Sequence, residues 1–540
     1  MIPLPIVVLV EEHTPAYWIQ GVIASLHSSL KAPFSIDVRV VPPVGLHSPI
    51  PGAPVLSIMA NSLLSIDRWL RSIARFADRL NRRKQSPASR TESVPFSASL
   101  SAPSATRRLG KAESIVAPGE MAISLLRATR TLLQSGKLDG CNVLWAECDE
   151  TVLGSSAFGF LSALASRAAT VDVVVNGALP ALPHRTLVWS RSAVRSVSPS
   201  FNDEMLAARV TDLLGLCLET LRTDQFDNTV PVATMPQSTD SARDRLDASS
   251  LLRLSNRRLF TAQFGKRRRL RWTLAYRRTI GESVDASFTS VPQSELIMPP
   301  PGHAWADPFP VRTEGRDLIF FEQEVVAEGR GHIAVAELHA DGTLGPVTRV
   351  LETSFHMSYP CVFQAYGSWF MVPESRADQR VTLYRAADFP FRWEKERDLL
   401  IGPRLADATL FHRDGMWWML ACRIGAGAST FEDLVGYRAT DLLGTWTAIR
   451  ELPLSSDATA GRPAGHLLQT PQGLLRPAQD GSHRYGYGLA LRQVTQLTAQ
   501  SYSECEYARV TPTWLPELRG VHTFNRSSHL TVVDILQALY

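Results

Sequence analysis

At 540 residues the chain is too long for one hydrophobic core, because single cores stop growing at about 250–300 residues. Its 45% hydrophobic and 20% charged residues are ordinary for a globular protein, so two domains joined by a linker are expected. The formal net charge of +4 is small for this length and the basic residues form no recognisable face, so a nucleic-acid partner is not indicated.

The N-terminus, the hydropathy pattern and the cysteines indicate in which cellular compartment the protein is expected. The N-terminus is a short apolar run that turns acidic and lacks a basic leader, which predicts a strand and not a signal peptide. No stretch of about 18 uncharged apolar residues occurs, so no transmembrane segment is predicted. The six cysteines form no C-x-x-C pair and no Cys/His metal spacing, a pattern typical of buried thiols in a reducing compartment. These features predict a cytoplasmic protein.

Residues 1–222 have the pattern of an α/β domain. A buried strand at 5–10, a helix that starts after Thr14-Pro15 and a second strand at 35–41 indicate a parallel sheet. No G-x-G-x-x-G follows the first strand, so a dinucleotide cofactor is not predicted. Further strands are predicted at 141–147, 170–176 and 186–191, and helices at 61–83, 119–135, 152–167 and 203–222.

Two segments lack this periodicity. Residues 84–118, rich in Ser, Ala, Pro and Thr, are predicted to be a disordered insertion, and the polar residues 223–262 a linker. The helix at 61–83 carries many arginines, which suits either a membrane surface or a solvated face over a core.

Residues 263–540 contain a repeat of short strands. Similar openings recur at intervals of about 47–58 residues, each with a small or polar residue before apolar ones. The openings are ADPFPV from Ala306, YPCVFQ from Tyr359, ADATLF from Ala406, AGHLLQ from Ala464 and VHTFNR from Val521. Most continue through a turn into an aromatic-rich second strand and then a third, which is the pattern of a propeller blade.

Five openings predict a five-bladed β-propeller, with a two-sheet sandwich as the competing architecture. The last opening is followed by only one further strand, TVVDIL. Because a closed ring leaves no unpaired edge, the early strand at 271–277 is expected to complete the last blade.

The motif order in this half resembles a known family. HAWADPF, HMSYPCVF, VPES, LYRAADFP, ADATLF, AGHLL, RPAQD and HTFN resemble the propeller domain of plant glucosamine inositolphosphorylceramide transferases. That domain is similar to five-bladed glycoside hydrolases such as arabinanases, β-xylosidases and invertases. Bacterial proteins carry it behind a formyltransferase-like domain, and the opening of this chain with ATVDVVVN resembles a reduced, Rossmann-type version of that fold. The Asn, His and Asp of the formyl-transfer signature are not recognisable, so no folate site is expected.

The resemblance implies chemistry at acids near the blade openings. Glycoside cleavage needs one carboxylic acid that protonates the leaving oxygen and one carboxylate that acts as base or nucleophile. By the resemblance Asp307 is the base or nucleophile, Asp407 orients the substrate or tunes the acid, and Glu374 is the candidate acid. The structural alternatives are a turn cap for Asp307 and backbone binding for Glu374. Asp407 has the alternative of a buried ion pair with Arg404 or Arg476.

Other residues near the openings are candidates for substrate binding. Aromatic rings can stack on sugars, and Arg and Gln can donate to hydroxyls or a phosphate, while inter-blade packing is the alternative for each. The candidates are Trp305, Tyr359, Arg476, Gln479 and His522. The histidines at 303, 356, 466 and 522 suit hydrogen-bonded channel positions better than a metal, so neither a metal nor another cofactor is predicted.

The leading expectation is a carbohydrate-active enzyme that acts on a glycosidic bond, by hydrolysis or glycosyl transfer, in surface glycan or glycolipid biosynthesis. The alternative is a propeller that binds a glycan or sugar nucleotide without catalysis, attached to a degenerate formyltransferase-like domain. Formyl transfer within residues 1–222 is a third, less favoured possibility. In all three cases no nucleic acid is expected as partner.

Overall fold

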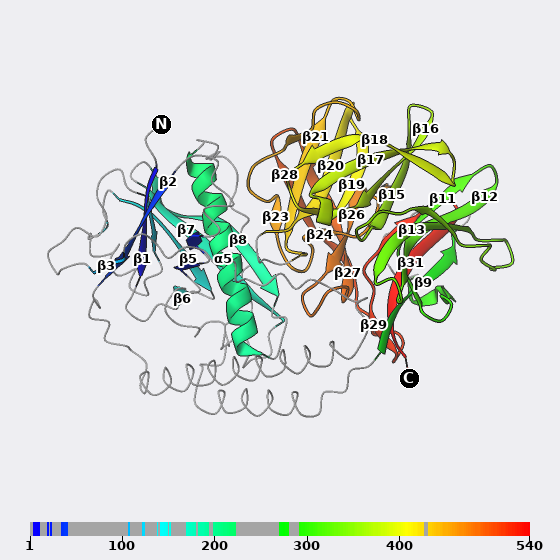
Figure 1. Ribbon diagram of the computed structural model, residues 1–540, viewed down its shortest axis with the longest axis horizontal. Coiled ribbons are helices and arrows are strands. Elements are labelled where there is room, and N and C mark those ends of the chain that lie inside the picture. The colour runs from blue at the N-terminus through cyan, green and yellow to red at the C-terminus, as the bar shows by residue number, and fades with distance from the viewer. Residues whose placement is uncertain are drawn as a thin grey trace. The chain divides into compact units, whose positions relative to one another are not determined.

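The computed structural model divides the chain into two units, chiefly between Gly265 and Lys266, each with its own sheets (Figure 1). The structure describes residues 4–10, 19–20, 22–23, 34–41, 106–108, 121–124, 138, 141–148, 151–152, 169–179, 182–193, 198–222, 269–279, 291–425 and 430–539. Among these residues, no helix is both long enough and apolar enough to cross a membrane.

The N-terminal unit is built on one mixed sheet with the order β3-β2-β1-β4-β5-β7-β8. Five strands run parallel: β1 (Leu4–Val10), β2 (Phe34–Val40), β3 (Thr106–Arg108), β4 (Met121–Ser124) and β5 (Asn142–Cys148). Antiparallel strands follow: β6 (Thr151–Val152), β7 (Thr170–Leu179) and β8 (Leu182–Ala193). The continuous apolar run of β1 is buried between two parallel neighbours, as central strands of such sheets are.

The helix α5 (Pro199–Arg222) packs on β5, β7 and β8 (Figure 1). It begins after Ser198, whose Oγ accepts the backbone N–H of Phe201 at 3.3 Å and so caps the first turn. Its buried face carries Val210, Leu213 and Leu218 at helical spacing. The predicted helix at 203–222 is therefore confirmed and is longer at its start.

The predicted strands of this unit are confirmed, but two other predictions are wrong in part. The helix predicted at 119–135 begins instead with β4, because Ala122 and Ile123 are buried between β1 and β5 in a short apolar run that mimics helical spacing. Within the insertion predicted at 84–118, residues 106–108 form β3 at the sheet edge. The helix at 61–83 and the linker 223–262 lie outside the described residues, as do most of the predicted helix at 152–167 and the rest of the insertion. The formyltransferase-like fold remains a prediction.

The C-terminal unit is a five-bladed β-propeller, as predicted, and not a sandwich (Figure 1). Blade I consists of β11 (His303–Thr313), β12 (Arg316–Val325), β13 (Arg330–Glu337) and β14 (Thr348–Leu351). Blade II consists of β15 (Ser358–Ala365), β16 (Ser368–Glu374), β17 (Arg380–Asp388) and β18 (Arg392–Ile401). Blade III consists of β19 (Leu405–Arg413), β20 (Met416–Arg423), β21 (Asp433–Ala439), β22 (Thr447–Ala448) and β23 (Ser455–Ser456).

The last two blades have an interrupted inner strand. Blade IV consists of β24 (Arg462–Pro463), β25 (Leu468–Thr470), β26 (Gly473–Asp480), β27 (Gly488–Leu497) and β28 (Tyr502–Val510). Blade V consists of β29 (Leu518–Gly520), β30 (Phe524–Arg526), β31 (Leu530–Leu539), β9 (Arg269–Arg278) and β10 (Glu295–Ile297). The antiparallel pairing of β31 with β9 confirms that the early strand closes the ring.

The inner strands of blades I to III share a bulge at the same point of the repeat. The antiparallel register shifts after Ala306, after Ser358 and after Ala406. At each shift a non-glycine residue has a positive φ: Asp307 at 52°, Tyr359 at 46° and Asp407 at 54°. Such residues are uncommon and occur at functional sites, so the repeat places a special backbone geometry where the acids lie.

Candidate functional site

Asp307 lies at the bulge of β11 and its carboxylate is 2–3% exposed. Oδ1 accepts the hydroxyl of Thr523 at 2.7 Å, and Oδ2 accepts the backbone N–H of Tyr359 at 3.2 Å. Its own N–H donates to Oδ2 of Asp534 at 2.9 Å. Blades I, II and V therefore meet at this one residue.

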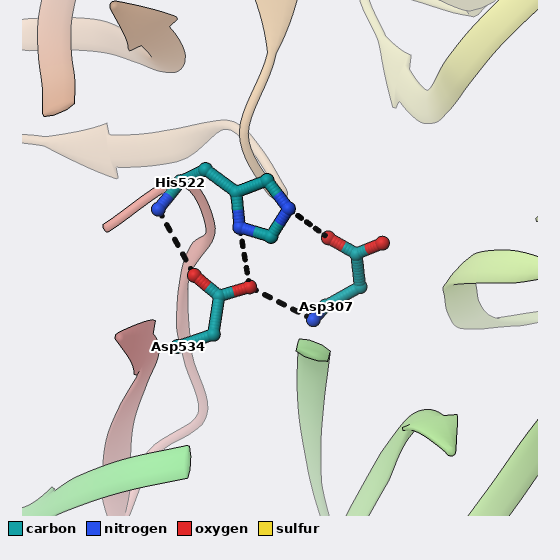
Figure 2. Close-up of side chains that lie close together, drawn as sticks. All are labelled: Asp307, His522 and Asp534. Atoms are coloured by element: carbon teal, nitrogen blue, oxygen red, sulfur yellow. Dashed lines mark hydrogen bonds and ion pairs between the residues drawn. The ribbon is translucent and has the colours of Figure 1, made fainter. Parts of the chain in front are cut away.

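His522 and Asp534 form the other half of this arrangement, which Figure 2 shows. Nδ1 of His522 lies 2.6 Å from Asp534 Oδ2, and Nε2 lies 3.6 Å from Asp307 Oδ1. The imidazole also stacks on Trp272 with ring centroids 4.1 Å apart. Burial lowers the pKa of His522, but the charges of Asp534 and Asp307 together raise it above its ordinary value. The two carboxylates thus favour the protonated form of the imidazole.

Asp307, His522 and Asp534 have donor atoms within 4.8 Å of one another, the spacing of a metal site. The protein's own donors already engage these atoms, however. Oδ1 of Asp534 accepts the N–H groups of His522 and Thr523, each at 2.9 Å, and its Oδ2 accepts Asp307 N–H. These contacts fit a carboxylate of Asp534 that holds the neighbouring backbone and the imidazole of His522 in place. We therefore assign no metal to this group of three residues.

Asp407 occupies the matching bulge of blade III but has charged partners. Its carboxylate binds Arg462 through two hydrogen bonds, from Nε at 2.5 Å and from Nη2 at 3.0 Å. Gln479 Nε2 donates a third at 2.7 Å. The side chains of Asp407 and Arg462 are 0% and 3% exposed, so this is a buried ion pair. The pairing with Arg404 or Arg476 that the sequence allowed is wrong, because Arg462 of blade IV takes that place.

Glu374 lies at the end of β16 and is 4% exposed. Its Oε1 lies 3.4 Å from Nε of Arg376. Burial raises the pKa of Glu374 to about 7, against the lowering effect of Arg376, and the charges of Asp407 and Asp307 raise it further. Burial likewise raises the pKa of Asp307 to about 6, with His522 acting in the opposite direction and Asp407 adding to the rise. The three predicted acids therefore share one electrostatic environment.

Glu322 is a fourth acid of this group, which the sequence reasoning missed. It lies opposite Ala306 in the β11–β12 pair, just as Glu374 lies opposite Ser358 in the β15–β16 pair. The two glutamates thus occupy the same position of the repeat, directly across from the residue before the bulge. Comparison of the second strands, FFEQE and MVPE, contained this signal.

The carboxyl of Glu322 is held by a defined contact. Nδ1 of His356 accepts the backbone N–H of Gly331 at 2.9 Å, so the ring proton is on Nε2, which lies 3.3 Å from Glu322 Oε1. A Cβ at Gly331 would meet that Oε1 at 2.4 Å, so glycine is needed there. Burial, and then the charges of Asp307 and other acids, raise the pKa of Glu322 well above its ordinary value.

Three predicted substrate ligands lie instead in the packed interior: the rings of Trp305 and Tyr359, and the side chain of Arg476. Trp305 is 4% exposed and packs on Phe321 in the cluster that joins blades I and V. Tyr359 is 0% exposed, and its hydroxyl pairs with Thr409 Oγ1 at 2.8 Å. We therefore leave both rings out of the site, although the backbone N–H of Tyr359 binds Asp307.

Arg476 is also fully buried. Its Nε and Nη2 bind the carboxylate of Glu504 at 2.8 and 2.7 Å, and Nη2 also donates to the carbonyl of Ala460. Arg476 and Glu504 lie on β26 and β28 of the same blade, so these contacts hold strands of blade IV together and do not join two blades, and Arg476 is not placed in the site. Gln479 holds Asp407, and His522 contacts Asp307 directly, so both belong to the site as positioning residues.

His466 lies between inner strands of the propeller. Its ring Nε2 lies 3.0 Å from the carbonyl of Val362 in blade II, and its ring packs edge-on against Phe309 of blade I. Burial lowers the pKa of His466 to about 4, so the ring is neutral and donates from Nε2. This is the hydrogen-bonded channel position expected for it.

Tyr485, which the sequence reasoning also missed, is an exposed aromatic residue beside these acids. It is 42% exposed, its hydroxyl lies 3.1 Å from Nε2 of His522, and the guanidinium of Arg462 lies 5.2 Å from its ring centroid. It therefore links the surroundings of Asp307 and Asp407.

Comparison with known proteins gives one family. Residues 292–537 match the family described as "Glucosamine inositolphosphorylceramide transferase 1, N-terminal". The enzyme of that name from Oryza sativa subsp. japonica is 33% identical over 209 residues, which are 38% of this chain and 28% of the rice protein. The Arabidopsis thaliana enzyme is 30% identical over 211 residues, 38% of this chain and 27% of that protein. The match thus spans less than a third of the length of these relatives.

Among solved structures, similar chains include sugar-cleaving enzymes. A glycosyl hydrolase from Bacteroides ovatus has a TM-score of 0.33 at 11% identity, with 43% of this chain and 83% of that chain covered. An exo-β-1,3-galactanase from Phanerochaete chrysosporium has a TM-score of 0.30 at 13% identity, with 38% and 49% covered.

Proposed function

We propose that the propeller acts on a glycosidic bond, by hydrolysis or glycosyl transfer, in surface glycan or glycolipid biosynthesis. The observation that carries this is the pair of buried carboxyl groups with raised pKa values, about 6 for Asp307 and about 7 for Glu374, where the charge of Asp307 contributes to the rise at Glu374. The match of residues 292–537 to the N-terminal family of a glycosyl-transferring enzyme supports the same class of substrate.

The roles follow from the protonation states. Above its pKa of about 6, Asp307 is a carboxylate that can accept the proton of a water or an acceptor hydroxyl, or attack the anomeric carbon. Below its pKa of about 7, Glu374 keeps the proton that the leaving oxygen needs when the C–O bond breaks. Asp407 and its Arg462 partner keep a fixed geometry beside them, which suits an orienting role.

These roles predict a narrow, bell-shaped dependence of turnover on pH. The acid limb lies near 6, where Asp307 loses its proton, and the alkaline limb lies near 7, where Glu374 loses its own. Replacing Glu374 by Gln removes the proton donor, and we expect turnover to fall at every pH.

The decisive test uses the full-length protein on an array of glycans and sugar nucleotides. Asp307→Asn is nearly the same size and is expected to lower turnover of the best substrate by about 10²–10⁴-fold, with the circular dichroism spectrum unchanged. Turnover that survives this substitution refutes the assignment.

A second candidate is a propeller that binds a glycan or sugar nucleotide without cleaving it. Both oxygens of Asp307 accept hydrogen bonds from the protein, which favours a carboxylate that shapes a binding surface. Binding on the array without product, retained in Asp307→Asn, is the outcome that selects this candidate.

For residues 1–222 we propose a reduced formyltransferase-like domain in a cytoplasmic protein. Its parallel strands β1, β2, β4 and β5 support an α/β fold of this general kind. Titration of the full chain with folate in a calorimeter is expected to give no heat of binding, and a measurable heat would restore formyl transfer as a function.

A further inference from the structure

Tyr485 combines exposure with rigid support. The residue is 42% exposed, yet its hydroxyl and its ring are both in contact with charged groups of the site. The hydroxyl lies 3.1 Å from Nε2 of His522, and His522 is itself fixed by Asp534 at 2.6 Å. The ring lies 5.2 Å from the guanidinium carbon of Arg462, which Asp407 holds through two hydrogen bonds.

Two buried carboxylates thus hold Tyr485 indirectly, one through an imidazole and one through a guanidinium. A side chain so constrained loses little conformational freedom when it binds a ligand. Arg462 lies over the ring and the ring of His522 packs edge-on against it, with centroids 5.3 Å apart, and the exposed part of the residue is available for contact. An aromatic ring offers an apolar face, and a tyrosine adds a polar group at its edge.

The protonation state of His522 sets the direction of its hydrogen bond with the hydroxyl of Tyr485. When His522 is protonated between Asp534 and Asp307, its Nε2–H donates to the oxygen of Tyr485. The O–H of Tyr485 is then free to donate to a ligand. The same Nε2 is 3.6 Å from Asp307 Oδ1, so a ligand on Tyr485 lies beside the acid proposed to react.

We propose that Tyr485 is the contact on which a sugar ring stacks in this site, with its hydroxyl donating to a hydroxyl or ring oxygen of the same sugar. The inference rests on the proposed function and names its ligand class: a cyclic sugar with one C–H-rich face. His522, Asp534 and Arg462 are positioning residues that hold Tyr485 in place, and His522 also contacts Asp307.

The test measures binding separately from turnover. The full-length protein is mixed with methyl glycosides of glucose, galactose, mannose, N-acetylglucosamine and glucuronic acid, and saturation-transfer NMR identifies those that bind. We expect Tyr485→Ala and Tyr485→Leu to weaken the best binder by about tenfold or more. Tyr485→Phe keeps the ring and is expected to lose only about threefold. Tyr507→Ala is the matched control, because Tyr507 is 39% exposed on the outer strand β28 and lies outside the site.

Three outcomes overturn the inference. Equal binding by Tyr485→Ala and the unmodified protein excludes stacking, and equal loss in Tyr507→Ala shows a non-specific effect. Binding of none of the five glycosides by the unmodified protein also overturns it. The proposed function is decided separately by Asp307→Asn. If that variant loses turnover while Tyr485→Ala binds the glycoside normally, the proposed function stands and only the role of Tyr485 is refuted.

Discussion

Blades I and III present an aspartate at the same point of the repeat with almost the same backbone, yet the two side chains have different surroundings. Asp307 and Asp407 have φ angles of 52° and 54° and both are buried. Asp307 accepts from a hydroxyl and a backbone N–H and lies 3.6 Å from an imidazole, whereas Asp407 is bound by the guanidinium of Arg462. The repeat sets the backbone, and the partners from blades IV and V set the chemistry.

The comparison separates a reactive position from a structural one. A carboxylate with mostly neutral donors can gain or lose its proton near neutral pH, and the pKa of Asp307 is raised to about 6. Asp407 instead receives two charge-assisted hydrogen bonds from a permanent cation, the guanidinium of Arg462. Removing the charge is therefore expected to lower the free energy of unfolding at Asp407 and not at Asp307.

The largest expected effect on stability is that of Asp407→Asn. It leaves the guanidinium of Arg462, 3% exposed, without a counter-charge, and breaking a buried pair in this way costs about 3–5 kcal/mol. Urea unfolding measures this free energy. Asp307→Asn is the matched control from the same repeat position, and we expect it to unfold no more readily than the unmodified protein. Equal destabilisation by the two variants contradicts the distinction.

A second effect, of the opposite sign, is expected for Glu374→Gln. The folded state raises the pKa of Glu374 from 4.5 to about 7, so the stability from its protonated form is present below about 4.5 and lost as pH rises through 7. This difference in pKa corresponds to about 3 kcal/mol as an upper value. The glutamine variant should match the unmodified protein at pH 4.5 and exceed it in unfolding free energy at pH 8. A variant less stable at pH 8 contradicts the raised pKa.

The repeat and the ring closure could be predicted from sequence because they rest on strand patterns and on the need to pair every edge. The equivalent positions of Asp307 and Asp407 followed from the same repeat, which also placed Glu374 at the end of the second strand of blade II. Orientation was harder: each bulge adds a residue to the inner strand and interrupts the alternation of faces. The regular alternation of side chains between the two faces of a strand therefore could not show that Trp305 and Tyr359 point into the packed interior.

The missed residues have a different cause. Arg462, Tyr485 and Asp534 are distant in sequence from the acids they serve, and they come from a broken inner strand, a loop and a second strand. No local pattern marks a residue whose role depends on another blade. Glu322 is the exception, because its match with Glu374 was visible in the aligned second strands.

A smaller effect, confined to the blade I side, is expected for Gly331→Ala. The added Cβ would lie 2.4 Å from Glu322 Oε1 and 2.8 Å from the backbone carbonyl of Met357, so the glutamate must move. Overpacking of this kind costs about 1–3 kcal/mol in unfolding free energy. Gly345→Ala is the control, since its added Cβ would come no nearer than 3.2 Å to any other atom, the nearest being Nε2 of the His339 side chain. We expect the acid and alkaline limbs of the pH dependence of turnover to shift in Gly331→Ala only. Unchanged limbs in that variant would show that Glu322 does not influence the groups that react.

The smallest and most specific effect is expected for Thr523→Val. The Thr523 hydroxyl stabilises the ionised form of Asp307 through its 2.7 Å hydrogen bond and lowers the pKa of that carboxyl, so removing the hydroxyl raises this pKa. A hydrogen bond of about 1 kcal/mol corresponds to an upward shift of up to about one pH unit in the acid limb of turnover. Thr382→Val removes a similar bond, 2.8 Å long, to Asp398 in blade II and should cost similar stability without moving the limb. If both variants leave the acid limb in place, the limb does not report Asp307, and the group that titrates there must be sought among the other acids of the site.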